Sequence, residues 1–152
     1  MKLFYGVMAL ACVPAMVAAT EGFYPKEKVA EFVVQKLDVT TLPAAIRPKP
    51  QKGKKTLAEY GYVIRPIADK EALAVAEAPA GAQISIKVLE QESSGIFVCL
   101  GGQAKDGSSH VQRVYQLRMK NANGLLKGRE SWREFDSCPV IGGVEGEASS
   151  SY

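Results

Sequence analysis

The order of apolar and polar residues divides the chain into one amphipathic helix followed by a series of short strands. Apolar residues at Val29, Phe32 and Val33 repeat at helical spacing, and the preceding Pro25 is suited to a first helical turn. Charged residues fall mostly on the other side of this stripe. The pattern therefore predicts an amphipathic helix over Pro25–Lys36 that packs on a sheet by one face.

Beyond this helix the pattern changes to a period of two, which is typical of half-buried strands. Ile96–Leu100 is apolar on both faces and is expected to be a central strand covered by the helix. Turn residues separate the runs, so the stretch from Glu71 to Lys120 predicts an antiparallel meander. The alternating runs are Tyr60–Ile64, Leu73–Val75, Ile84–Val88 and Val111–Met119.

The carboxy-terminal part begins with a helix-start signal. Ser131 and Glu134 have the spacing of a capping box, so a short helical turn that buries Trp132 and Phe135 is expected. The predicted fold class is α+β: the helix packs on an antiparallel meander of about four to six strands, and a short carboxy-terminal helix follows. Residues 20–144 are expected to form a single domain, with a flexible tail over residues 145–152.

The first nineteen residues have the pattern of a signal peptide. Lys2 precedes an uncharged run, and the small or apolar Val17 and Ala19 occupy the −3 and −1 positions of a cleavage site. The sequence therefore predicts export, to the periplasm or the exterior, after cleavage near Ala19. The alternative is a lipid anchor on Cys12, because residues 9–12 loosely match a bacterial lipobox.

Removal of the leader leaves two cysteines, Cys99 and Cys138. In an oxidising compartment such a pair favours a disulfide over metal binding or thiol catalysis. A nucleophilic Cys99 assisted by His110 would need a partly exposed thiol with a lowered pKa. Cys99 lies instead within an apolar run, which favours the structural interpretation.

Charge is nearly balanced over the 152 residues, with 19 Lys and Arg against 16 Asp and Glu, so general coating of nucleic acid is not indicated. The exception is Arg47–Lys55, which has five cations, two prolines and no acid and is expected to be an exposed, extended loop. The candidate binding residues in this loop are Arg47, Lys49, Lys52, Lys54 and Lys55.

Two interpretations of this basic loop stay open. It is either a solvated loop or a docking site for an anionic polymer, a membrane surface or a protein partner. No aromatic residue interrupts the loop, so no specific signal for nucleic acid is present. Tyr60 and Tyr62 are expected on one face of a strand, where they either pack in the sheet or stack on a sugar.

No residue pattern indicates a cofactor, and none is expected. His110 is the only histidine, so a multi-histidine metal site cannot form within one chain, and no metal site is predicted. Ser108, Ser109 and His110 are adjacent, but neighbours in a strand point to opposite faces. Glu90 and Glu92 flank a predicted turn and are free to face solvent without acid–base chemistry.

The leading hypothesis is a small exported, non-catalytic binding module that docks an anionic partner through the basic loop. A small secreted or periplasmic hydrolase, with Ser and His or paired carboxylates in a cleft that the sequence does not reveal, is the first alternative. A structural component of the cell envelope is the second. The oligomeric state and the identity of the ligand stay open at this stage.

Overall fold

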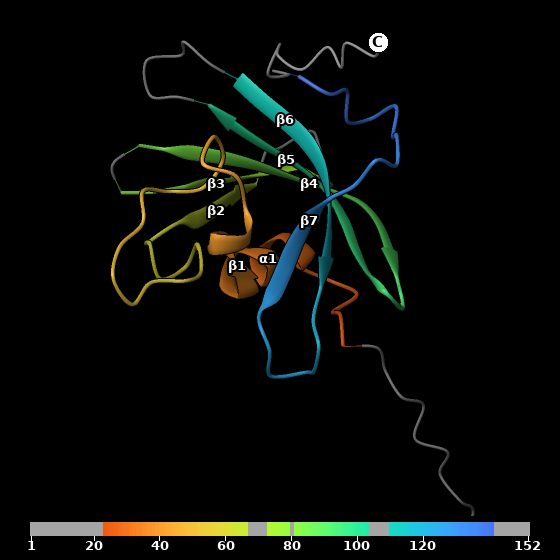
Figure 1. Cartoon of the computed structure of the whole chain (residues 1–152), viewed down its shortest axis with the longest axis horizontal. Helices are drawn as coiled ribbons and strands as arrows, with labels where there is room; N and C mark the ends of the chain where they lie inside the picture. The colour runs from red at the N-terminus through yellow and green to blue at the C-terminus, as the bar shows by residue number, and fades with distance from the viewer. Residues whose placement is uncertain (1–22, 67–72, 80, 104–109, 142–152) are drawn as a thin grey trace, which may run out of the picture.

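A computed structural model describes residues 23–66, 73–79, 81–103 and 110–141. The predicted signal peptide over residues 1–19, Cys12 and the predicted tail over residues 145–152 lie outside the described residues. The described residues form one seven-stranded sheet that curls around a single α-helix (Figure 1).

Consecutive elements are mostly neighbours in the sheet. The strand order is β1-β7-β6-β5-β4-β3-β2, in which the strands from β2 to β7 form an antiparallel meander and β1 is added in parallel to β7. The sheet is therefore mixed. The elements are α1 (Val29–Lys36), β1 (Leu37–Asp38), the 3-10 helix η1 (Val39–Thr41), β2 (Val63–Pro66), β3 (Leu73–Glu77), β4 (Gln83–Glu92), β5 (Gly95–Gln103), β6 (His110–Arg118) and β7 (Leu126–Glu130).

The predicted α+β class is wrong, because the protein is mostly β. The amino-terminal helix has only eight residues and begins at Val29 rather than at Pro25. Lys28, which precedes it, adopts a left-handed backbone with φ of 53° and provides no side-chain cap. The antiparallel meander predicted over Glu71–Lys120 is present as β3 to β6. The structure extends it by β2 and β7, and the sheet has more strands than the four to six expected.

The predicted carboxy-terminal helix is also wrong. Ser131 does cap the turn, since its hydroxyl accepts a hydrogen bond from the Arg133 amide at 3.2 Å. The Ser131 amide, however, donates to the Val114 carbonyl at 2.9 Å and so extends the pairing of the sheet. Tertiary contacts of the following residues hold the chain extended, and they override the local capping signal.

The main apolar core lies between α1 and the inner, concave face of the sheet. Helix α1 packs against β2 and β4. The core is closed near the helix by the Tyr24 hydroxyl, which accepts a hydrogen bond from the Met119 amide at 3.1 Å. The fully buried core residues on this face include Val33, Leu37, Leu57, Ile84, Ile86, Ile96, Val98, Leu100, Tyr115, Leu117 and Leu126.

Strands β1 and β7 were missed by the sequence analysis because neither has a recognisable apolar alternation. In β7, Leu126 is buried, but the next inward position is Gly128. A Cβ at Gly128 would lie 3.1 Å from the Leu42 side chain, so a larger residue has little room there. The Gly128 amide also donates to the Thr41 hydroxyl at 2.9 Å, which ties β7 to η1.

Candidate binding site on the outer face of the sheet

The outer face of the sheet has a second, smaller apolar cluster, and residues 131–141 cross it as an extended strap. The Cys99–Cys138 disulfide joins the strap to β5, which confirms the predicted bridge. At the far end of the strap, Ile141 pairs with Gln112 of β6. The buried members of the cluster are Phe97, Cys99, Val114 and Cys138, with Leu89 and Phe135 packed against them.

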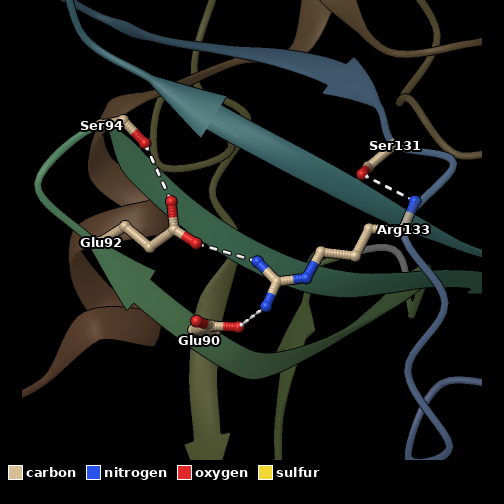
Figure 2. A network of polar contacts seen from close by, with 5 residues as sticks. All are labelled: Glu90, Glu92, Ser94, Ser131 and Arg133. Atoms are coloured by element: carbon tan, nitrogen blue, oxygen red, sulfur yellow. Dashed lines mark hydrogen bonds and ion pairs between the residues drawn. The ribbon is translucent and has the colours of Figure 1, made fainter.

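At its other end the strap is held by Arg133, which binds two carboxylates of β4 (Figure 2). Its two terminal nitrogens lie 2.8 Å from Glu92 Oε1 and 2.5 Å from Glu90 Oε2. Its guanidinium carbon also lies 4.9 Å from the ring centre of Phe97 and 5.0 Å from that of Phe135. We call Arg133 with Glu90 and Glu92 the Arg133 clamp.

The electrostatics of the clamp favour ionised carboxylates. The pKa of Glu92 is lowered first by its hydrogen bond from Arg133 and then by the hydrogen bond from the Ser94 hydroxyl, at 3.1 Å. Hydrogen bonds to the charged form favour that form. Glu90 and Glu92, for which the sequence analysis found no partner, therefore position the strap through Arg133.

A β-bulge explains how two even-numbered glutamates reach the outer face of β4. Ile86, also even-numbered, is buried in the inner core. The register shifts between Val88 and Glu90, so that Glu90 pairs with the outer residue Phe97 and Glu92 pairs with Gly95. Since one extra residue reverses the alternation of side chains, the bulge directs both carboxylates toward the strap.

The clamp leaves Trp132, the only tryptophan of the chain, fully presented to solvent. Its side chain is 96% exposed. Ser131 and Arg133 on either side are bound to the sheet, so the indole between them points away from these contacts. The prediction that Trp132 is buried in a helical turn is wrong. An exposed indole offers a flat apolar face with a polar N–H at its edge, so Trp132 is a candidate contact for a ligand that occupies a neighbouring site.

Beside the indole lies a groove of about 410 Å³ between β6 and β7. The register pairs Arg118 with Lys127 and Gln116 with Arg129, so these side chains share the outer face. Trp132 forms part of the wall. The remaining lining residues are Gly128, Glu130 and Ser131.

The groove is cationic. Within the described ranges, none of Arg118, Lys127 and Arg129 forms an ion pair with a carboxylate. Arg118 does contribute to the lowered pKa of Glu92, after the stronger effects in the clamp. The groove's own carboxylate, Glu130, lies 3.3 Å from Arg113 Nε. Three cations beside one engaged carboxylate therefore give this surface a positive potential.

The structure places the basic loop elsewhere, beyond the β1 edge of the sheet (Figure 1). Lys49, Lys52 and Lys55 are exposed, whereas Arg47 and Lys54 are half-buried. The loop is not a free coil. Its turn forms around Gly53, whose φ of 83° favours glycine, and the Lys54 amide donates to the Gln51 carbonyl at 3.2 Å.

Tyr60 and Tyr62 do not form the expected pair on one strand face. Strand β2 begins at Val63, and Tyr60 lies in the preceding turn. The Tyr60 hydroxyl accepts a hydrogen bond from the Gln51 amide at 2.9 Å, and Lys54 Nζ lies 5.5 Å from its ring centre. Tyr62 is buried, and this burial raises its pKa. Both rings therefore act in packing the loop against the core.

The candidate catalytic groups do not converge. His110 is exposed at the start of β6, while Ser108 and Ser109 lie outside the described residues. The Cys99 sulfur is held in the disulfide. A second cavity, of about 320 Å³, lies beside Tyr62 and has Glu31 as its carboxylate. Over the described ranges there is no cluster of His, Cys, Asp or Glu that could hold a metal ion.

The outer-face groove was not identified from the sequence. A weak signal was present, because Lys127 and Arg129 are separated by a glycine and precede Trp132 by a few residues. That pattern was obscured by the capping signal at Ser131. The contribution of Arg118 could not be read from the sequence, since it depends on the register between β6 and β7.

Comparison with known proteins gives no assignment: no family model matches the chain, and no curated protein and no solved structure shows significant similarity to it. Among the helices in the described part of the chain, none is long and apolar enough to cross a membrane.

Proposed function

We propose that this protein is an exported, non-catalytic binding module that takes an acidic polysaccharide in the groove between β6 and β7. The observation that carries the proposal is the fully exposed Trp132, held beside three cations by a segment that is fixed on both sides. The leader predicted over residues 1–19 and the Cys99–Cys138 disulfide support an oxidising, extracytoplasmic location.

The chemistry of the groove fits a chain of acidic sugars. The flat face of an indole packs on the apolar face of a sugar ring, with little loss of side-chain entropy because tryptophan is already rigid. Arg118 and Arg129 offer planar forks that match a carboxylate or sulfate in a bidentate manner. Lys127 adds a compact charge. We therefore expect salt-sensitive binding in which the ring contact provides the salt-resistant part.

The hydrolase alternative has less support. A glycosidase needs two carboxyl groups flanking a cleft, and each of the two cavities has one carboxylate among its lining residues. The nearby carboxylates Glu90 and Glu92 are occupied by Arg133. A binding role requires only the cations and the indole that already line the groove, and no second carboxylate.

The test measures binding of the mature protein to immobilised polygalacturonate. Trp132→Ala, and separately the pair Arg118→Gln and Arg129→Gln, should each reduce affinity about tenfold, which corresponds to the loss of contacts worth about 1.4 kcal/mol. The matched control replaces Arg65 by Gln, because Arg65 lies in β2, at the opposite edge of the sheet from β1. Unchanged affinity in the groove variants, or an equal loss in the control, would contradict the proposal.

The class of ligand is tested in the same experiment. Single-stranded nucleic acid also combines stacking bases with phosphates, so an oligothymidine of equal charge is run in parallel. We expect polygalacturonate to bind more tightly. Tighter binding of the oligonucleotide, lost on Trp132→Ala, would replace the polysaccharide by a nucleic acid.

A further inference from the structure

We infer that the binding path for the acidic polymer continues from the groove across the β1 edge of the sheet to the basic loop, so that one polymer chain contacts both. This inference rests on the proposed function, because it extends the same site. The sequence marked the basic loop and the structure revealed the groove. Their connection follows from the register of the strands between them.

One row of backbone pairs runs from the groove to the end of the basic loop, and its members Asp38 and Thr56 are buried. Arg118 of β6 pairs with Lys127 of β7, Lys127 pairs with Asp38 of β1, and Asp38 pairs with Thr56 directly after the basic loop. Three strand spacings of about 4.8 Å each separate the first and last members of this row. The β1–β7 pairing and the Asp38–Thr56 bridge place the end of the loop next to β1, at the edge of the sheet.

The near end of the basic loop is fixed rather than free. The Lys55 carbonyl accepts a hydrogen bond from the Val39 amide at 2.8 Å, which attaches the loop to η1. The amides of Lys55 and Thr56 donate to the Glu59 carboxylate at 2.5 and 2.8 Å. A polymer that reaches this end therefore meets cations whose backbone is already ordered, which reduces the entropic cost of binding.

The other end of the loop is fixed as well. Ile46 is buried, and its backbone lies close to the inner side of Gly102 in β5. The amides of Ile46 and Arg47 both donate to the Pro43 carbonyl at 3.1 Å. The cations between the two ends are therefore presented on an ordered segment.

The charges along the path favour an anionic chain. In the described residues, no carboxylate forms an ion pair with a cation of the basic loop. The Glu59 carboxylate is directed at backbone amides, and these hydrogen bonds lower its pKa. Asp38, the acid in the row, is 9% exposed and accepts hydrogen bonds from the Thr40 amide and hydroxyl, so it offers little open negative surface.

The experiment compares the affinity of a short and a long acidic oligosaccharide for the mature protein, followed by the emission of Trp132. Digalacturonate is long enough for the groove alone, whereas a dodecamer can follow the whole path. We expect the dodecamer to bind about tenfold more tightly than the dimer, because loop contacts add to an already tethered ligand.

The discriminating variant replaces the three exposed loop lysines Lys49, Lys52 and Lys55 by Gln. It should bind the dimer as the wild type does and lose the gain of the dodecamer. The matched control replaces Lys26, Lys28 and Arg65 by Gln and should keep the gain. Thermal unfolding of both variants verifies that they are folded.

The outcomes separate this inference from the proposed function. If the dimer fails to change Trp132 emission, the groove itself does not bind and the proposed function fails. If the dimer binds but the dodecamer gains nothing, or the loop variant retains the gain, the continuous path is wrong while the groove site stands. An equal loss in the control variant would show that the tighter binding of the dodecamer depends only on the net charge of the protein. That result would also contradict the continuous path.

Discussion

The two faces of the sheet are stabilised in different ways. The inner face is covered by α1 and buries a large continuous set of aliphatic side chains, including Ile86, Leu100 and Leu117. The outer face buries only a small cluster, and a disulfide and an ion-pair clamp hold the strap over it. Apolar burial on the inner face provides most of the stability, whereas the outer face uses a few specific cross-links to position a segment.

This difference bears on function because cross-links fix geometry where burial is small. The strap has no core of its own, and without its attachments it would gain conformational freedom. The Arg133 clamp and the disulfide restrain it on either side of Phe135, and the clamp directly adjoins Trp132. The outer face thus buries few apolar side chains but holds the Trp132 indole exposed to solvent.

The largest expected effect follows from removal of the disulfide. Cys99→Ala with Cys138→Ala should lower the free energy of unfolding by about 4 kcal/mol, because the bridge closes a separation of 39 residues and restricts the unfolded chain. Urea denaturation of the two proteins measures the difference. A loss below about 1 kcal/mol would mean that the strap is held almost entirely by non-covalent contacts.

The inner face should be sensitive to the loss of single side chains. Leu117→Ala, at a fully buried position, is expected to cost about 3 kcal/mol through lost burial and the cavity left behind. The matched comparison uses Val98→Ala on the inner face and Val114→Ala in the outer cluster, which remove the same methyl groups. The inner variant should lose more stability, because its cavity lies within the larger continuous core. Equal losses, measured by urea denaturation, would contradict the contrast between the two faces.

A smaller effect is expected from the clamp. Arg133→Met keeps most of the side-chain length but removes both ion pairs, so the strap should loosen around Trp132 while the protein stays folded. Time-resolved anisotropy of the single tryptophan should fall. Anisotropy equal to that of the wild type would show that the clamp does not order the indole.

The same clamp should respond to acid. Because the folded-state pKa of Glu92 is lowered, its contribution is complete above the usual glutamate pKa of 4.5 and is lost as the pH falls through the folded value. The Trp132 anisotropy of the wild type should therefore decrease on acidification below about pH 4.5. Arg133→Met should show a flatter profile over the same range, and a wild-type profile as flat as that of the variant would contradict this mechanism.

The smallest effect at neutral pH concerns Tyr115, which is 1% exposed and whose hydroxyl has no hydrogen-bond partner among the described residues. Tyr115→Phe should change the free energy of unfolding by less than about 1 kcal/mol, because no hydrogen bond is lost. Burial, followed by Glu130, raises the pKa of Tyr115 to about 12, an effect that Arg113 partly opposes.

This raised pKa makes Tyr115 a source of alkaline instability. Between its unfolded value of about 10 and its folded value the unfolded state releases the proton first, so stability falls as the pH rises. Tyr115→Phe should fall less steeply from pH 9 to pH 11.5 in urea denaturation. Identical slopes for the two proteins would contradict the burial of this hydroxyl.

The sequence predicted the parts of the fold that depend on local apolar alternation. Strands β4, β5 and β6 followed from runs such as Ile84–Val88, and the disulfide followed from the count of cysteines and the predicted leader. Strand β1 could not be predicted, because its two residues pair with residues of β7 that lie far from them in the sequence. The mixed sheet depends on that non-local pairing.

The candidate site was less predictable for the same reason. Basic residues close in sequence, as at Arg47–Lys55, are visible in the sequence alone. The groove combines Arg118 with Lys127 through strand register, and the exposure of Trp132 depends on Arg133 reaching a bulged strand. Bulges and register come from tertiary pairing, which an individual sequence pattern does not encode.

The central claim is that the outer face presents Trp132 and its neighbouring cations to an acidic polysaccharide, and NMR of the folded protein tests it most directly. Titration with an oligogalacturonate should shift the single indole N–H resonance and the side-chain Nε–H resonances of Arg118 and Arg129, at concentrations that leave Glu31 and Val63 of the second cavity unperturbed. A saturating titration in which the indole resonance does not move would contradict the account.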